Sequence, residues 1–261
     1  MSWPMYAVDP DAMARFWPHL RQCLADQNIA ALPVALAHPA ELVPHWRDPA
    51  LLLSQTCGYP FVTSLRHGVR YVATPRFRAP GCEGAFYRSA VMVRADETAQ
   101  NIAAMAGRRA AYNSRDSQSG YNALRALVAP WATKGRFLAS TSETGSHRAS
   151  LRAVRVGEAD LAAIDVVTLA LVQAHAPEET AGLRVLCLTD QAPGLPFVTA
   201  PSTSDLDLTR LRTALAAACD GHTPAAQALL LEGVEVLPVE AYAVITAMQD
   251  AAERQGYPVL Q

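Results

Sequence analysis

The chain has 261 residues, of which 51% are hydrophobic, and its formal net charge is −2. This length can bury a sizeable core, and the composition is that of a globular protein rather than a disordered or fibrous one. The near balance of charge provides no basic surface for nucleic acid or anionic lipid. We therefore expect neither as a partner.

The N-terminal residues, Met1 to Asp9, contain no basic region followed by an apolar one. No later stretch is long and apolar enough to cross a bilayer, so we expect no membrane insertion. For the sequence as written, without a signal peptide, we expect a cytoplasmic location, and a periplasmic one if the N-terminus has been trimmed. The five cysteines lack a Cys-x-x-Cys pair, which predicts thiols and no metal site: Cys23, Cys57, Cys82, Cys187 and Cys219.

Taken in order, the first third of the chain alternates helix and strand patterns around one polar loop. That loop is Ser54–Tyr59, and it follows a short apolar run, as the ligand-binding loops of parallel sheets do. The predicted elements are a helix over 9–27, a buried strand over 33–37, a short helix over 38–46, a buried strand over 51–53, a helix to about 67 and a strand over 69–74.

The middle and last thirds continue the alternation, which predicts an α/β fold. Around a second polar loop we predict strands over 86–94, 109–112, 136–142, 161–164 and 183–188, and helices over 98–106, 120–130, 146–156 and 166–175. Long helices are predicted over 206–218, 224–231 and 239–255.

Two irregular segments, near 75–86 and 189–196, interrupt this alternation. They bracket a middle block with its own strand and helix pattern, so we expect the chain to leave one lobe, build a second and return. We predict one lobe from residues 1–84 plus 190–261 and the other from 85–189, with a hinge and an interlobe cleft. A single continuous sheet with long loops is the alternative.

The second polar loop, Ser117-Gln118-Ser119-Gly120, has the features of an anion site. Its serines can cap the helix that follows, and Gly120 lets a ligand approach the main chain. The first N–H groups of a helix have no partner within it, so an oxyanion can accept their hydrogen bonds. An ordinary capped helix is the alternative. The first loop offers Ser54, Gln55 and Thr56 in the matching place, with Tyr59 as a wall or hydroxyl donor.

Three further residues are candidates for binding a ligand. His147 begins a predicted helix, where its ring can donate to an anion, although a surface cap is the alternative. Asp165 lies at the carboxyl end of a predicted strand and can accept from a ligand amine or hydroxyl, or cap the next helix. Tyr87 begins the strand that enters the second lobe.

A set of short motifs runs through the chain up to about Thr199: 51–60 (LLLSQTCGYP), 72–75 (VATP), 79–84 (APGCEG), 87–89 (YRS), 116–120 (DSQSG) and 144–151 (TGSHRASL). As a set they resemble the phosphate/phosphite/phosphonate-type substrate-binding proteins of ABC transporters. The resemblance implies a type II periplasmic-binding-protein fold, with two α/β lobes, two hinge strands and a ligand held between them. It also implies that Ser117, Gln118 and Ser119 bind phosphonate oxygens and that His147 faces the cleft.

The function expected from these features is binding of a small oxyanion such as phosphate or phosphonate, with no cofactor, no catalytic residue and an ABC transporter permease as a possible partner. The alternative is a cytoplasmic enzyme on the same fold, acting on a small carboxylate or phosphorylated metabolite. Its candidate residues are Cys57 or Ser119 with His147, or Asp165 with His147, none at diagnostic spacing. A transcription regulator is disfavoured because no basic DNA-binding helix is present.

Overall fold

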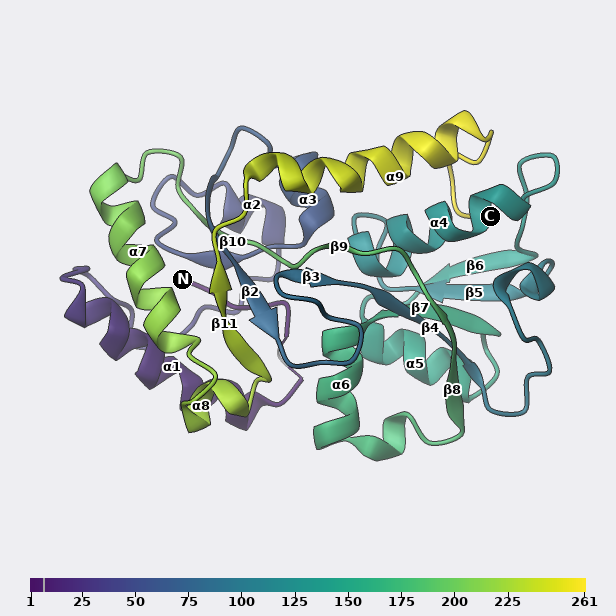
Figure 1. Cartoon of the computed structure of the whole chain (residues 1–261), viewed down its shortest axis with the longest axis horizontal. Coiled ribbons are helices and arrows are strands. Elements are labelled where there is room, and N and C mark those ends of the chain that lie inside the picture. Colours follow the sequence, from purple (N-terminus) through teal and green to yellow (C-terminus); the bar gives the residue numbers. More distant parts are fainter. Residues whose placement is uncertain (7) are drawn as a thin grey trace. The chain divides into compact units, whose positions relative to one another are not determined.

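The computed structural model describes residues 1–6 and 8–261 and confirms the predicted α/β class, with helices packed against sheets (Figure 1). The chain divides into two compact units. Unit 1 contains Met1–Phe86 and Pro193–Ala241, and unit 2 contains Tyr87–Ala192 and Tyr242–Gln261.

The last segment of the chain, Tyr242–Gln261, groups with unit 2, although we assigned it to the lobe formed by the N-terminus. Helix α9 (Ala243–Arg254) contacts helix α4 (Ala123–Val128). Asn122 Nδ2 donates to the Ile245 carbonyl at 2.9 Å, and an Arg125 nitrogen donates to the Pro258 carbonyl at 2.7 Å. A helical pattern predicts α9 itself, but nothing in it specifies which helix it packs against.

Unit 1 is built on a four-stranded antiparallel sheet. Its strands lie in the order β1 (Ser54–Gln55), β10 (Phe197–Thr199), β2 (Arg70–Phe77) and β11 (Leu231–Glu235). The helices of this unit are α1 (Pro10–Asp26), α2 (Leu42–Trp46), α3 (Gly58–Val62), α7 (Asp205–Ala218) and α8 (Pro224–Gln227).

Several predictions for unit 1 are wrong in detail. Residues 33–37 form no strand: the Val34 side chain is 90% exposed, and the Val34 carbonyl accepts from Trp17 Nε1 at 2.9 Å instead of pairing with a strand. The strands before and after α3 do run parallel to one another, as in a βαβ unit, with the antiparallel strand β10 between them. The predicted helix over 224–231 ends at Gln227, and strand β11 follows. Whether such a segment forms a strand depends on pairing with a distant segment. The periodicity of the sequence does not reveal that pairing.

Unit 2 is built on a five-stranded mixed sheet. Its strands lie in the order β6 (Ser140–Glu143), β5 (Arg109–Tyr112), β7 (Leu161–Asp165), β4 (Ser89–Arg94) and β8 (Leu183–Leu188). Strand β5 is parallel to β6 and β7, whereas β4 is antiparallel to β7 and β8. The other elements of unit 2 are α5 (His147–Arg155), α6 (Val166–His175) and the short turns η1 (Ile102–Met105), η2 (Gln118–Asn122), η3 (Ala129–Trp131) and η4 (Pro177–Glu179). The short paired strands β3 (Phe86–Tyr87) and β9 (Ala192–Pro193), and the turn η5 (Val239–Tyr242), span the points where the chain passes from one unit to the other.

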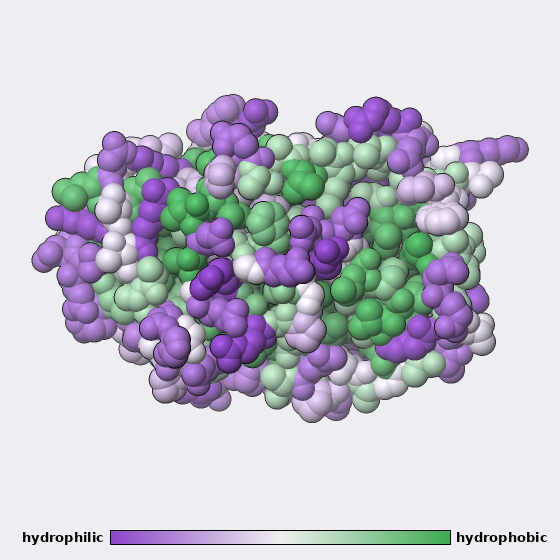
Figure 2. Space-filling model, in the orientation of Figure 1, coloured by the Kyte–Doolittle hydropathy of each residue, from purple (hydrophilic) through white to green (hydrophobic). Residues whose placement is uncertain are grey.

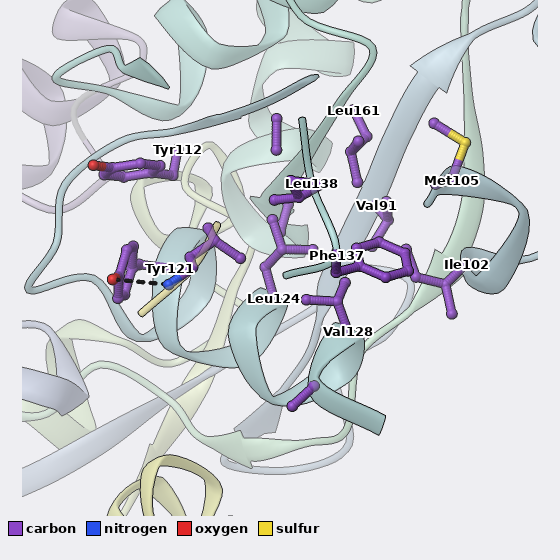
Figure 3. Packing of buried hydrophobic residues seen from close by; sticks show 14 of the residues in the cluster. Val91, Ile102, Met105, Tyr112, Tyr121, Leu124, Val128, Phe137, Leu138 and Leu161 are labelled. Carbon is purple, nitrogen blue, oxygen red and sulfur yellow. Dashed lines mark hydrogen bonds between the residues drawn. The ribbon is translucent and has the colours of Figure 1, made fainter. Parts of the chain in front are cut away.

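The core of unit 2 fixes the position of η2. In Figure 3 the rings of Tyr112 and Tyr121 lie one above the other, and they meet edge to face with centroids 5.0 Å apart. The hydroxyl of Tyr121 accepts from the Leu260 N–H at 3.2 Å, while Leu124 is fully buried among the other apolar residues of the cluster. Tyr112 ends β5 and Tyr121 lies in η2, so this contact holds η2 at the end of the strand.

The surface mixes polar and apolar residues on the face shown in Figure 2. Exposed apolar side chains include Trp131, Val185 and Leu188. Among the residues that the structure describes, no helix combines the length and the apolar character that a membrane span requires. The five cysteines are free thiols in the structure.

Replacing Tyr257 by alanine tests the assignment of the C-terminal segment. Its side chain is fully buried, so Tyr257→Ala should lower the free energy of unfolding by about 3–5 kcal/mol in a urea titration. Trp131→Ala is the matched control, because Trp131 is 53% exposed, and it should cost less than about 1 kcal/mol. A Tyr257→Ala protein as stable as the control would contradict the packing described here.

Candidate functional site

Three loops of unit 2 leave the sheet at one edge. Strands β5, β6 and β7 run parallel, so their carboxyl ends lie together, as the ends of parallel strands do in ligand-binding α/β sheets. Strand β5 leads into η2, β6 leads into α5 and β7 leads into α6. Each strand is therefore followed by a helix start at the same edge.

The loop after β5 is held by its own hydroxyls. Ser117 caps η2, since its Oγ accepts from the Gly120 N–H at 3.0 Å, and its Oγ lies 3.4 Å from that of Ser119. Turn η2 is a π-helical turn that continues directly into α4. Such turns are rare and frequently mark functional sites. Both serines are buried, at 3% and 4% exposure, so little water competes for their hydroxyls.

Gly120 is required because the Asn113 side chain lies against its main chain. A side-chain carbon at this position would overlap Asn113 Oδ1 and would lie 3.3 Å from His147 Cε1. Asn113 Oδ1 is buried and has no hydrogen-bond partner within the described residues. The sequence alone gives no reason to expect Asn113 in the site, because an asparagine after a strand is typical of any turn.

His147 joins the loop after β6 to the loop after β5. Its Nε2 lies 2.9 Å from Ser119 Oγ, and Ser146 caps α5 by accepting from the Ala149 N–H at 3.1 Å. Burial lowers the pKa of the His147 ring to about 4, and the Ala163 carbonyl acts in the opposite direction. The ring is therefore neutral at pH 7.

Asp165 and Gln118 lie at the same edge, and their side chains already make hydrogen bonds within the protein. Asp165 Oδ1 accepts from the N–H groups of Val167 at 2.7 Å and Thr168 at 3.1 Å, so it caps α6. Gln118 donates to Met248 Sδ at 3.2 Å and accepts from Asn122 Nδ2 at 2.7 Å. These contacts secure η2 and α6.

Ser89 is a second residue that the sequence analysis did not select. It begins β4 opposite Asp165, and its Oγ donates to the Ser119 carbonyl at 2.9 Å. The hydroxyl therefore ties η2 to the start of β4. A lone serine in a strand pattern gives no signal of such a role. Tyr87, two residues earlier, is buried at 4% exposure.

The first polar loop lies in unit 1, where the side chains of Ser54, Gln55 and Thr56 are fully buried. Ser54 Oγ lies 2.7 Å from Ser2 Oγ and accepts from Trp46 Nε1 at 3.2 Å, and Gln55 Nε2 donates to the Leu195 carbonyl at 3.2 Å. Thr56 Oγ1 donates to the Cys57 carbonyl at 3.3 Å, and Tyr59 is partly exposed in α3.

The arrangement in unit 2 suits an anion. The helix starts of η2 and α5 are joined by the Ser119 to His147 contact, and helix starts carry partial positive charge and N–H donors. The start of α6 is already occupied by Asp165. The described residues contain no group of three His, Cys, Asp or Glu side chains placed to hold a metal.

The variant Gly120→Ala tests the close approach. The added methyl group should displace Asn113 and destabilise the protein by about 1–3 kcal/mol, although alanine is otherwise the better helix former. Adding Asn113→Ala should recover most of the loss, which a double-mutant cycle in urea unfolding measures. Additive losses in the double variant would show that the two residues do not meet.

Comparison with known proteins identifies the family. The family model for periplasmic phosphonate substrate-binding proteins of ABC transporters matches residues 9–242. A search of curated protein sequences finds no significant match.

Solved structures share the fold at low sequence identity. A binding protein of a phosphonate ABC transporter from Pseudomonas aeruginosa superimposes with a TM-score of 0.76 at 14% identity, covering 98% of this chain and 87% of that one. PhnD1 of Prochlorococcus marinus, in complex with methylphosphonate, gives 0.74 at 14% identity over 97% of both chains. XAC2383 of Xanthomonas citri, bound to ATP, gives 0.70 at 14% identity over 98% and 97%. The predicted periplasmic-binding-protein fold is confirmed, and the chain belongs to the family of periplasmic phosphonate-binding proteins of ABC transporters.

Proposed function

We propose that the protein binds a phosphonate or phosphate-like oxyanion at the sheet edge of unit 2 where η2 and α5 begin. The observation that carries the proposal is the 2.9 Å contact of Ser119 Oγ with His147 Nε2, which joins two helix starts. The family match supports it, as does a protein of the same fold whose structure contains methylphosphonate.

The proposed binding uses donors at these two helix starts. Ser117 Oγ accepts from the Gly120 N–H and keeps one hydroxyl proton, which it can donate to an anion or to Ser119 Oγ. The N–H groups at the start of η2 and α5 add partial positive charge, which attracts an anion. These donors are fixed by caps and by the Tyr112 to Tyr121 contact, so little ordering is needed when an anion arrives.

The other candidates from the sequence are proposed either to contact the ligand or to hold a loop in place. Thr56 and Tyr59 are the residues of the first loop, in unit 1, that are proposed to contact a ligand. Ser54 and Gln55 serve mainly to hold that loop, because their side chains bond within unit 1. Tyr87 and Asp165 are proposed to contact the organic part of a phosphonate, and Gln118 to hold η2.

The enzyme alternative has one geometric feature in its favour, the contact between Ser119 and His147. A hydroxyl at this distance from a neutral imidazole resembles a nucleophile with its base. A nucleophile also needs a base oriented by a third group and a substrate carbonyl or phosphoryl placed for attack. Membership of a binding-protein family favours binding without chemistry.

The physiological setting proposed is that of the family. The protein would deliver its anion to the permease of an ABC transporter, working in the periplasm. A small anion bound by uncharged donors can be released without separating a tight ion pair, which suits a protein that must pass its cargo on.

The double variant Ser117→Ala with Ser119→Ala tests the site. It should lose about 1–3 kcal/mol of affinity for methylphosphonate in calorimetry, because charge-assisted hydrogen bonds are worth about that much and the main-chain donors remain. His147→Ala should also weaken binding. Ser142→Ala, an exposed serine of β6, is the matched control and should bind as the wild type does.

Calorimetry with the wild-type protein should also measure the binding of phosphate, phosphite and ATP beside that of methylphosphonate. No binding of any of them at millimolar concentration, or a double variant that binds as tightly as its parent, would refute the proposed site.

A further inference from the structure

The side chain of Asn113 lies beside both helix starts of the site. Asn113 follows β5 directly, and its carbonyl accepts from the Gly145 N–H at 2.9 Å, in the loop before α5. A side-chain carbon built on Gly120 would lie 1.9 Å from Asn113 Oδ1 and 3.3 Å from His147 Cε1. The Asn113 amide therefore occupies the small space between η2 and the first residue of α5.

The surroundings of this amide decide which of its ends faces inward. The inner end, Oδ1, is buried without a hydrogen-bond partner among the described residues, and it lies against the main chain of Gly120. A carbonyl oxygen can accept the weak C–H contacts that a glycine offers, whereas an NH₂ group in the same place would leave two donors without an acceptor. The oxygen therefore faces Gly120, and the nitrogen lies at the outer end of the amide.

The nitrogen at the outer end is available to a ligand. In the part of the chain that the structure describes, Asn113 Nδ2 makes no hydrogen bond and is not buried. The carboxylate of Asp116, in the same loop, accepts from Ser114 Oγ at 2.6 Å instead. An amide nitrogen carries two protons and accepts none, so Asn113 presents unused donors beside the start of η2 and of α5.

We infer that Asn113 is a further binding residue of the site, on the function proposed above, and that its Nδ2 donates to an oxygen of the bound phosphonate or phosphate. The amide is uncharged, so it adds a donor without the cost of removing a cation from water. Its oxygen end is held against Gly120, so little rotational freedom is lost when the anion binds. The absence of a side chain at position 120 is what lets the amide lie there.

The side-chain NH₂ resonances of Asn113 test the inference directly. In wild-type protein labelled with ¹⁵N and ¹³C, this NH₂ pair can be assigned through its own Cβ. Titration with methylphosphonate should move the pair downfield, with the same apparent Kd as the Ser119 amide. Asn101 is the matched control, because its side chain caps η1, before the other end of β5, and accepts from the Ala104 N–H at 3.1 Å. Its NH₂ pair should stay in place.

Two variants separate donation from packing. Asn113→Ala removes the donor and should weaken methylphosphonate binding at least about tenfold in calorimetry, as expected for one hydrogen bond to a charged group. Asn113→Asp keeps the shape but replaces the donor by a carboxylate, which repels the anion, so binding should weaken at least about tenfold further. Ser142→Ala should bind as the wild type does. A residue that only fills the space beside Gly120 would give the opposite order, with aspartate closer to wild type than alanine.

An Asn113 NH₂ pair that stays in place while the Ser119 and Gly120 amides shift would overturn the inference and leave the proposed anion site intact. So would an Asn113→Ala protein that binds as tightly as the wild type, or an Asn113→Asp protein that binds more tightly than Asn113→Ala. If a variant does not fold, the resonances of the wild-type protein still decide. If methylphosphonate does not bind the wild-type protein at all, the proposed function itself fails.

Discussion

The parallel pairing of β5 with β6 and β7 is the constraint on which the candidate site depends. It brings three chain reversals to one edge of the unit 2 sheet, although their residues lie about 30 and 50 positions apart in sequence. The edge-to-face contact of Tyr112 with Tyr121 then fixes η2 at the end of β5. The hydrogen bond between Ser119 and His147 can form only because these longer-range contacts place η2 and α5 side by side.

The charge balance of the chain agrees with this mode of recognition. A net charge of −2 provides no long-range attraction for an anion, and the groups that bond to Ser119, from His147 and Ser89, are uncharged. In the proposed site, recognition would therefore rest on hydroxyls, main-chain N–H groups and helix starts, whose positions are set by folding. The loss of one hydrogen bond should change affinity without disturbing a wider network of charges.

Local patterns in the sequence predicted much of this arrangement. The small polar residues before a helix predicted the loop of Ser117 and Ser119, and the strand patterns of β7 and β8 were found within a residue or two. What sequence alone could not give depends on distant partners. Asn113 lies against Gly120, and the Ser89 hydroxyl donates to the Ser119 carbonyl. Helix α9 joins unit 2 through the hydrogen bond that Asn122 donates to the Ile245 carbonyl. The helix and strand periods report which face is buried, not what covers it.

The central claim is that an oxyanion binds at the start of η2 and α5, and amide chemical shifts test it most directly. In a ¹H–¹⁵N correlation spectrum titrated with methylphosphonate, the largest changes should fall on residues 117–120 and 145–149, with the His147 ring nitrogens shifting in step. Changes concentrated elsewhere, for example around Arg152 and Arg155 of α5, with Ser119 and Gly120 unmoved, would contradict the account.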